Sequence, residues 1–565
     1  MEIHPMPSKI KFPGARKGRV LTNCTLVILS AFLMLADVQP ANAGKLRNNG
    51  TVVVLHGATN TYQTVSNGRG ATGGFIWNGG TITLNQQANF YNYDSVGNTA
   101  PGTVHNTYGN SYGIINTRNF NNGSAAYVGT FLNDSSTVGG GTLNIAGAFT
   151  NGTPSKFTTL KGTVNYNGGI AQQISDSVNS NTYGTLQTAT GGTKTMINPI
   201  TVATALSIGA GSTLNENGKT LTINGTSSNA GTFTANGAGS TTIYNGSGAQ
   251  TVLAATYYNL TVQSTGQKSA AGAVTVSNLL SVATANDSLD FAANTFTLSP
   301  GASVTSSGKL KSSGTVTVPS LNPTIGGTFV YYGGAQTVAG ANYTNLVLRN
   351  AGVKTLPGTD TVAVSGTYTM EASPTRTYAA GNTFIYNGTG AQSIVGGAGD
   401  SYQRLILSSA TDTSSANYKT IAGGNVTITN NASAGFIVLG TTAVDMGANS
   451  ITFGASHSDS IQGNSKVKWS GNNVYLPGTG VTEFYGSGAG SVVAGAAYGN
   501  MLFTGSGVKS IGAGVTVTAT GGASSTTGVY VYNNLTVAAT GVLNVTHMDL
   551  NNDGVLTNNG SITVN

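Results

Sequence analysis

Hydrophobic residues recur at every second position of this chain, in runs of about four or five residues. The runs read, in chain order, TVVVL, GTITL, GTLNI, KTLTI, GTVTV, NVTITN, GVTVT and GSITV. Successive side chains of a β-strand point to opposite faces, so each run predicts a short strand with an apolar inner face and a Thr, Ser or Asn outer face. Gly and Asn, which tolerate turn conformations, close the runs. We therefore expect an all-β protein with very little helix.

A longer motif, Tyr-Asn-Gly-x-Gly-Ala-Gln followed by a second Tyr, returns five times. Its copies begin at Tyr166, Tyr244, Tyr331, Tyr386 and Tyr485. The Gln falls at positions 172, 250, 336 and 392, with Gly490 in the fifth copy, so the intervals are 78, 86, 56 and 98 residues. Three of these intervals differ by about 20 residues, the size of one solenoid coil. Propeller blades would keep a nearly constant length, so we predict a parallel β-solenoid with stacked equivalent side chains.

The first residues have the pattern of an export signal. Basic residues precede an apolar run, Leu26–Ala36, which is too short to span a bilayer. Small residues at Ala41 and Ala43 then predict cleavage before Gly44. We expect residues 1–43 to be a signal peptide and the mature protein to be extracellular or on the cell surface.

The remaining chain divides by its pattern into two parts. Residues 44–160 lack the motif and are rich in aromatic residues. A solenoid needs its first coil covered, because bare strand edges invite pairing. We interpret this part as an N-terminal cap with the first coils, and residues 161–565 as the repetitive solenoid. No cap pattern is visible near the C-terminus, which makes end-to-end self-association an alternative.

Composition excludes several classes of protein. Charged residues make up 7% and hydrophobic residues 39%, which does not fit solvated disorder. The one Cys, Cys24, belongs to the predicted signal, so the mature chain has no thiol chemistry. Without that segment 19 basic and 15 acidic residues remain, with no basic patch for nucleic acid. No second apolar stretch is long enough for a membrane span.

The motif and the rhythm Gly-x-Leu-x-x-x-Gly-x-Ile/Val-Thr-Val resemble the β-helical repeat regions of bacterial surface adhesins and autotransporter-type passenger domains. The resemblance covers about residues 160–565. It implies a β-helix that works in adhesion, in a surface coat or in an extracellular matrix, with surface or matrix glycans or proteins as partners. Neither a translocator barrel nor a sorting tail follows in the sequence, so the resemblance does not extend to autotransport by this chain.

The residues that usually carry catalysis are sparse. The acidic residues are scattered, and the closest pair in the middle of the chain, Asp287 and Asp290, fits a turn. We therefore expect a non-enzymatic protein. The alternative is a β-helical glycan-binding or glycan-degrading protein, which requires acids or a Lys/Arg–Asp cluster on one face of adjacent coils.

One segment offers metal ligands. Asp549, Asn551 and Asp553 match the first half of a calcium loop, but Gly560 stands where a bidentate Glu is wanted. Calcium is thus a candidate beside the simpler interpretation of a turn, and we expect no other cofactor. The histidines of the mature chain lack ligand partners at suitable spacing; they are His56, His105, His457 and His547.

Two repeated side-chain types suggest surfaces. The second Tyr of each motif copy forms either an exposed row that stacks on sugars or, as we favour, a buried ladder. These residues are Tyr183, Tyr257, Tyr343, Tyr402 and Tyr498. Thr-x-Thr pairs are common on the outer face of ordinary β-strands, where Thr is enriched. The alternative is an ice- or crystal-binding face, which requires the pairs of successive coils to lie in register. The pairs are Thr220/Thr222, Thr315/Thr317, Thr427/Thr429 and Thr516/Thr518.

Overall fold

The structure is a computed structural model. It describes residues 139–151, 156–174, 182–319, 323–358, 360–397, 401–409, 418–429, 434–440, 442–447, 449–453, 458–461, 466–469, 481–484, 490–492, 497–498, 500–504, 508–513, 515–519, 528–551 and 554–564, and short strands between residues 45 and 135. The predicted signal peptide lies outside the described residues.

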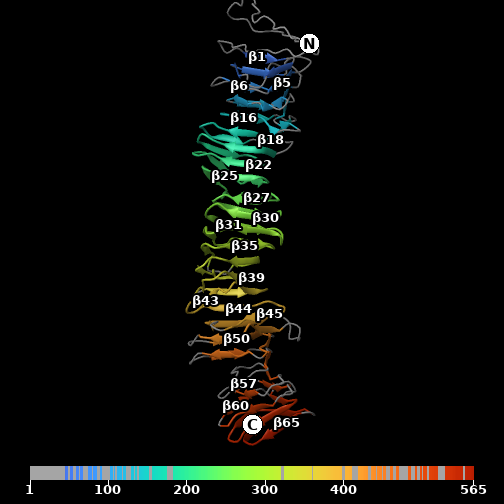
Figure 1. Ribbon diagram of the computed structural model, residues 1–565, viewed down its shortest axis with the longest axis vertical. Coiled ribbons are helices and arrows are strands. Elements are labelled where there is room, and N and C mark those ends of the chain that lie inside the picture. The colour runs from blue at the N-terminus through green and yellow to red at the C-terminus, as the bar shows by residue number, and fades with distance from the viewer. Residues whose placement is uncertain are drawn as a thin grey trace, which may run out of the picture. The chain divides into compact units, whose positions relative to one another are not determined.

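The described residues form a parallel β-solenoid of about 15 turns without any helix, which confirms the predicted fold class. The chain divides into two compact units, residues 1–245 and residues 246–565, in each of which successive strands stack (Figure 1). Within the described residues, the search for a helix both long and apolar enough to cross a membrane finds none.

The first unit contains two main stacks of parallel strands. One stack comprises β16 (Thr142–Ile145), β18 (Lys156–Tyr166), β20 (Thr182–Thr188), β22 (Ile200–Ile208), β24 (Thr220–Ile223), β25 (Thr226–Asn229) and β27 (Thr241–Tyr244). The other comprises β19 (Gln172–Ile174), β21 (Thr193–Met196), β23 (Thr213–Asn215) and β26 (Thr232–Thr234). The long β22 pairs with both β24 and β25, so one strand on one turn lies against two on the next.

Strands that precede residue 160 join the same pattern. Four of them pair in parallel and lead into β18; they are β2 (Thr51–Val54), β5 (Gly74–Asn78), β8 (Gly102–His105) and β13 (Gly129–Leu132). Residue 160 lies inside β18, and the division into an N-terminal cap with first coils and a repetitive solenoid stays a prediction.

The second unit repeats this arrangement. Its first turns are built from β28 (Gln250–Val252), β29 (Ala255–Val262), β30 (Gly266–Ala270), β31 (Val274–Val282), β32 (Asp287–Asp290), β33 (Phe296–Leu298), β34 (Ser303–Ser306), β35 (Lys309–Ser312), β36 (Val316–Thr317), β37 (Thr324–Tyr331) and β39 (Ala341–Arg349). Later turns include β38 (Gln336–Thr337), β40 (Val353–Leu356), β41 (Thr361–Val364), β43 (Thr375–Tyr378), β44 (Thr383–Tyr386), β45 (Gln392–Val395), β47 (Arg404–Ser409), β48 (Lys419–Ala422) and β50 (Ala434–Gly440).

The core lies inside the coils, where alternate residues of each strand are buried. In β31 the side chains of Val274, Val276 and Leu280 are fully or almost fully buried, and Thr275 between them is only half-buried. Burying one such aliphatic side chain contributes about 1.5–3 kcal/mol. The predicted alternation of apolar inner and polar outer residues is therefore confirmed in this strand.

Candidate functional site

The glutamine of the motif lies inside the solenoid and bonds the motif's own turn to the preceding coil. In the third copy, the side-chain oxygen of Gln336, Oε1, accepts a hydrogen bond from the Gly333 N–H at 3.0 Å. Its amide group donates to the Ser312 carbonyl at 3.1 Å and the Gly314 carbonyl at 2.8 Å. One side chain thus satisfies three backbone groups on two turns, and an unmet backbone group in such a buried place is costly.

A lysine from the following coil completes this arrangement. The Lys354 Nζ donates to the carbonyl oxygens of Gly333 at 2.5 Å, Gly334 at 2.9 Å and Asn350 at 3.4 Å. Lys354 also lies directly next to Gln336 in the register of β38 and β40. We call the two residues a Gln–Lys pair. Among the contacts found in the described residues, the Lys354 ammonium group donates to backbone carbonyl oxygens and to no carboxylate.

The Gln–Lys pair recurs in the first four copies of the motif. Every member has at most 8% of its surface exposed, and the pairs are Gln172/Lys194, Gln250/Lys268, Gln336/Lys354 and Gln392/Lys419. Lys419 is displaced in sequence by an insertion, yet it occupies the same position in register. In the fifth copy Lys509 is buried opposite Gly490.

The glycine of the turn is required by the closeness of the coils. A Cβ placed on Gly168 would lie 2.0 Å from the Ala146 carbonyl oxygen, and one on Gly388 would lie 2.1 Å from that of Ser365. No side chain fits at such distances, so only Gly allows the turn to approach the coil beside it. The repeated motif is therefore the sequence of one buried junction between coils.

The electrostatics of this junction follow from burial. Loss of water lowers the pKa of Lys194, Lys354 and Lys509, and it lowers that of Lys419 to about 8. Burial likewise lowers the pKa of Lys268, and the nearby charge of Asp287 opposes that change. An amine with a lowered pKa is a candidate nucleophile, but here its donors point at backbone oxygens in the interior. The arrangement therefore suits structure rather than catalysis.

The five tyrosines predicted as a row or ladder are all buried, with at most 3% of their surface exposed. In the third copy the hydroxyl groups of Tyr331 and Tyr343 are hydrogen-bonded at 2.7 Å, and the Tyr343 hydroxyl also lies 2.8 Å from the Ala339 carbonyl oxygen, to which it donates. The same contact joins Tyr386 and Tyr402 at 3.1 Å. Rings in this position offer no face to a sugar, and the arrangement is the buried one favoured above.

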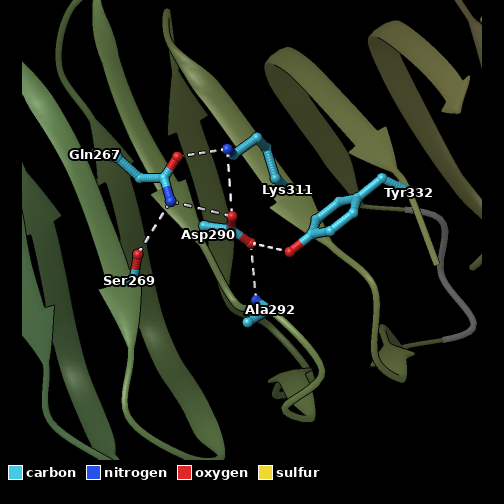
Figure 2. Close-up of polar contacts among 6 residues, drawn as sticks. All are labelled: Gln267, Ser269, Asp290, Ala292, Lys311 and Tyr332. Atoms are coloured by element: carbon cyan, nitrogen blue, oxygen red, sulfur yellow. Dashed lines mark hydrogen bonds and ion pairs between the residues drawn. The ribbon is translucent and has the colours of Figure 1, made fainter.

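A second polar cluster lies on the outside of the second unit, across four successive turns. Figure 2 shows this Asp290 cluster, which comprises Gln267, Ser269, Asp290, Ala292, Lys311 and Tyr332. The Lys311 Nζ lies 3.2 Å from Asp290 Oδ2 and donates to Gln267 Oε1 at 2.6 Å. Tyr332, just after β37, donates its hydroxyl proton to Asp290 Oδ1 at 2.8 Å. This is the Lys–Asp cluster that the glycan-active alternative requires.

The bonding of Asp290 limits what this cluster does chemically. Oδ1 accepts from the Tyr332 hydroxyl and the Ala292 N–H, and Oδ2 accepts from Gln267 and contacts the Lys311 ammonium. A carboxylate has about four acceptor positions, and all four are used. A general base needs an oxygen that is open to the substrate. The cluster therefore links turns and lacks the open carboxylate of a hydrolase site.

The predicted calcium ligands are only partly described. Asp549 in β64 (Met548–Leu550) and Asn551 are exposed, whereas Asp553 lies outside the described residues. Across the described part of the chain, no three His, Cys, Asp or Glu residues come together as a metal site. Among the histidines, His547 is half-buried and its ring lies 6.0 Å from that of Tyr530.

Two buried ionisable residues escaped sequence reasoning. Glu216 in the first unit is fully buried; Thr242 donates to its Oε1 at 2.6 Å, and Oε2 has no partner among the described residues. Burial raises the pKa of Glu216 to about 8. Arg376 in the second unit lies within 6 Å of three tyrosine rings and donates to the Tyr368 hydroxyl at 3.0 Å. No sequence pattern marks either residue, since each stands where an apolar side chain is usual.

Comparison of the chain with protein-family models, with curated proteins and with solved structures finds no match.

Proposed function

We propose that this protein is a non-catalytic, exported surface or matrix protein that adheres or scaffolds through the outer faces of its solenoid. One observation carries the proposal. In the described residues, the ionisable and amide side chains of the Gln–Lys pairs and of the Asp290 cluster are engaged in joining one coil to the next. What the coils present outward is mainly a repeated set of neutral hydroxyl and amide groups.

The outer amide groups illustrate this repetition. Asn165 donates to Asn144 on the neighbouring turn at 2.9 Å, and Asn278 donates to Asn259 at 2.7 Å. Such columns keep a fixed spacing along the coils, which suits binding to extended or repetitive partners. Surface glycans and matrix proteins are the partner classes implied by the resemblance to bacterial adhesin repeats.

Self-association belongs to the same proposal. Three large apolar side chains are 49–60% exposed on β64, β65 (Val555–Asn558) and β66 (Ser561–Val564); they are Leu550, Val555 and Val564. The three strands belong to three different sheets, and large exposed apolar side chains are candidates for contact with another chain. A scaffold role predicts that the sedimentation coefficient of the purified protein rises with concentration.

The test of the adhesive role uses beads coated with the exported protein. Native beads are expected to be retained on at least one member of a panel of printed glycans and matrix proteins, and heat-unfolded coated beads are not. The same glycans are incubated with the protein and analysed for released oligosaccharides. Release of oligosaccharides that disappears in Asp290→Asn would contradict the proposal and favour a glycan-degrading enzyme.

A further inference from the structure

Four threonines on successive turns of the second unit stand in one column. Thr256 pairs in register with Thr275, Thr275 with Thr297, and Thr297 with Thr317. Their neighbours along each strand, such as Val276 in β31, are buried in the core. The four threonines are exposed or half-buried and therefore lie on the outer face.

A second column runs beside the first. Thr295 and Thr315 each precede a member of the first column by two residues, and both are exposed. The hydrogen-bonded pairing of neighbouring turns extends to these two residues, because the Phe296 N–H donates to the Thr315 carbonyl at 2.9 Å. Two successive turns thus present the same Thr-x-Thr pair, with hydroxyls about 4.8 Å apart between turns and about 6.7 Å apart along a strand. We call these six residues the threonine array.

The threonine array differs from the other polar columns in two respects. Within the described residues, none of its six hydroxyl groups has a hydrogen-bond partner, whereas the outer asparagines bond to one another. The four strands that carry the first column, β29, β31, β33 and β36, also contain no Asp, Glu, Lys or Arg, and the nearest charged residues, Asp290 and Lys311, lie on the neighbouring strands β32 and β35. The array therefore offers free hydroxyl and methyl groups at fixed spacing on uncharged strands.

We propose that the threonine array binds the surface of ice. The inference rests on the proposed adhesive role and names one solid surface for it. Ice is neutral and repeats its oxygen atoms in two directions with spacings close to those of the array. Threonine hydroxyls join a hydrogen-bond network of water without the strong hydration that holds liquid water around charges. The two columns lack the aromatic rings and amide or acid groups that orient a sugar.

The test compares the whole exported protein with two single variants during slow ice growth. Wild-type protein is expected to partition into the growing ice. Thr297→Lys, which puts a hydrated charge at the centre of the array, should lower the fraction in ice about fivefold, the equivalent of one lost hydrogen bond of about 1 kcal/mol. Thr222→Lys alters a half-buried threonine on the outer face of the first unit and should leave it unchanged.

Controls separate this inference from folding and from the proposed function. Circular dichroism should show the same strand content for all three proteins, and Thr297→Ser, which keeps the hydroxyl, should partition more than Thr297→Lys. Exclusion of wild-type protein from ice would overturn the inference, as would an equal loss in Thr222→Lys. Retention on powdered cellulose or chitin without partition into ice would also overturn it, while leaving the adhesive role intact.

Discussion

Lys354 and Lys311 belong to the same unit and both contact neighbouring turns, but their surroundings differ. Lys354 is fully buried and its ammonium group meets three backbone carbonyl oxygens. The Lys311 side chain is 22% exposed and its ammonium group meets the Asp290 carboxylate and the Gln267 amide oxygen. The Lys354 ammonium group satisfies one buried and two part-buried carbonyl oxygens. Lys311 instead forms an ion pair with the largely buried Asp290 carboxylate, and its own end of that pair is open to water and salt.

The difference between the two lysines indicates that the stability of the fold depends more on the buried lysines than on the ion pairs at the surface. A solenoid turn buries carbonyl oxygens where two coils meet closely, and a flexible side chain with three donors reaches several of them at once. When such a side chain is removed, each carbonyl oxygen that loses its donor stays away from water, and this unsatisfied state is costly. When one partner of a surface ion pair is removed, water solvates the other partner, and the loss of stability is small.

The largest effect is expected for Lys354→Met. Methionine keeps an unbranched apolar side chain, one atom shorter, but leaves the carbonyl oxygens of Gly333, Gly334 and Asn350 without this donor. We expect the local free energy of unfolding around β38 and β40 to fall by about 4 kcal/mol. Hydrogen exchange of peptides from residues 330–358 measures it.

Lys309→Met is the matched control, because Lys309 is exposed in the same unit. Exchange in that control should match the wild-type protein. Similar protection in Lys354→Met and Lys309→Met would mean that the buried lysine does not stabilise the turn, and the contrast between interior and surface lysines would be lost.

Glu216 provides the second test, since it is a buried ionisable group whose hydrogen bond comes from the neutral Thr242 hydroxyl. Burial raises its pKa to about 8 from 4.5. The folded protein therefore holds this proton over a range in which the unfolded chain has released it. The stabilisation is complete below about pH 4.5 and is lost as the pH rises through about 8, a fall of about 3 kcal/mol from pH 5 to pH 8.

Hydrogen exchange of residues 213–244, corrected for the intrinsic rate at each pH, reports this fall. Glu216→Gln cannot titrate and should remove the dependence between pH 5 and pH 8. An equal pH dependence in wild type and Glu216→Gln would assign it to other groups.

Gln336→Leu should have an intermediate effect. The variant leaves the Gly333 N–H and the carbonyl oxygens of Ser312 and Gly314 without their partner. These groups are neutral, so we expect a loss of about 2 kcal/mol, smaller than for Lys354→Met. Urea unfolding that tracks exchange in residues 309–338 measures it, and a loss larger than that of Lys354→Met would reverse the order of the two members of the pair.

The sequence predicts the fold because its period and its repeats agree. Alternation in runs such as Val274–Val282 predicts strands with one buried face, and the recurring motif predicts stacking of equivalent residues. Both are confirmed by the parallel register, in which Val274 lies next to Phe296 and Val276 next to Leu298. Turn residues also follow the prediction, because closely approaching coils leave no room for a side chain at positions such as Gly168.

The polar interior could not be predicted in the same way. Lysine after each motif copy is visible in the sequence, but its burial depends on carbonyl oxygens that only the stacked turns bring together, as at Lys419 after an insertion. Glu216 and Arg376 follow no repeat. The Asp290 cluster joins residues up to 44 positions apart, from turns whose lengths the sequence does not reveal.

The smallest effect is expected for Lys311→Met, which tests the surface half of the comparison. The variant removes the ion pair with Asp290, but that carboxylate keeps the Tyr332 hydroxyl, the Ala292 N–H and the Gln267 amide as donors. We expect less than about 1 kcal/mol of destabilisation, and less still in 1 M salt, where exposed pairs are screened. Exchange of residues 287–312 at low and high salt measures both quantities. A loss as large as that of Lys354→Met, unchanged by salt, would show that the outer cluster is as essential to the stacking of these turns as the interior pair.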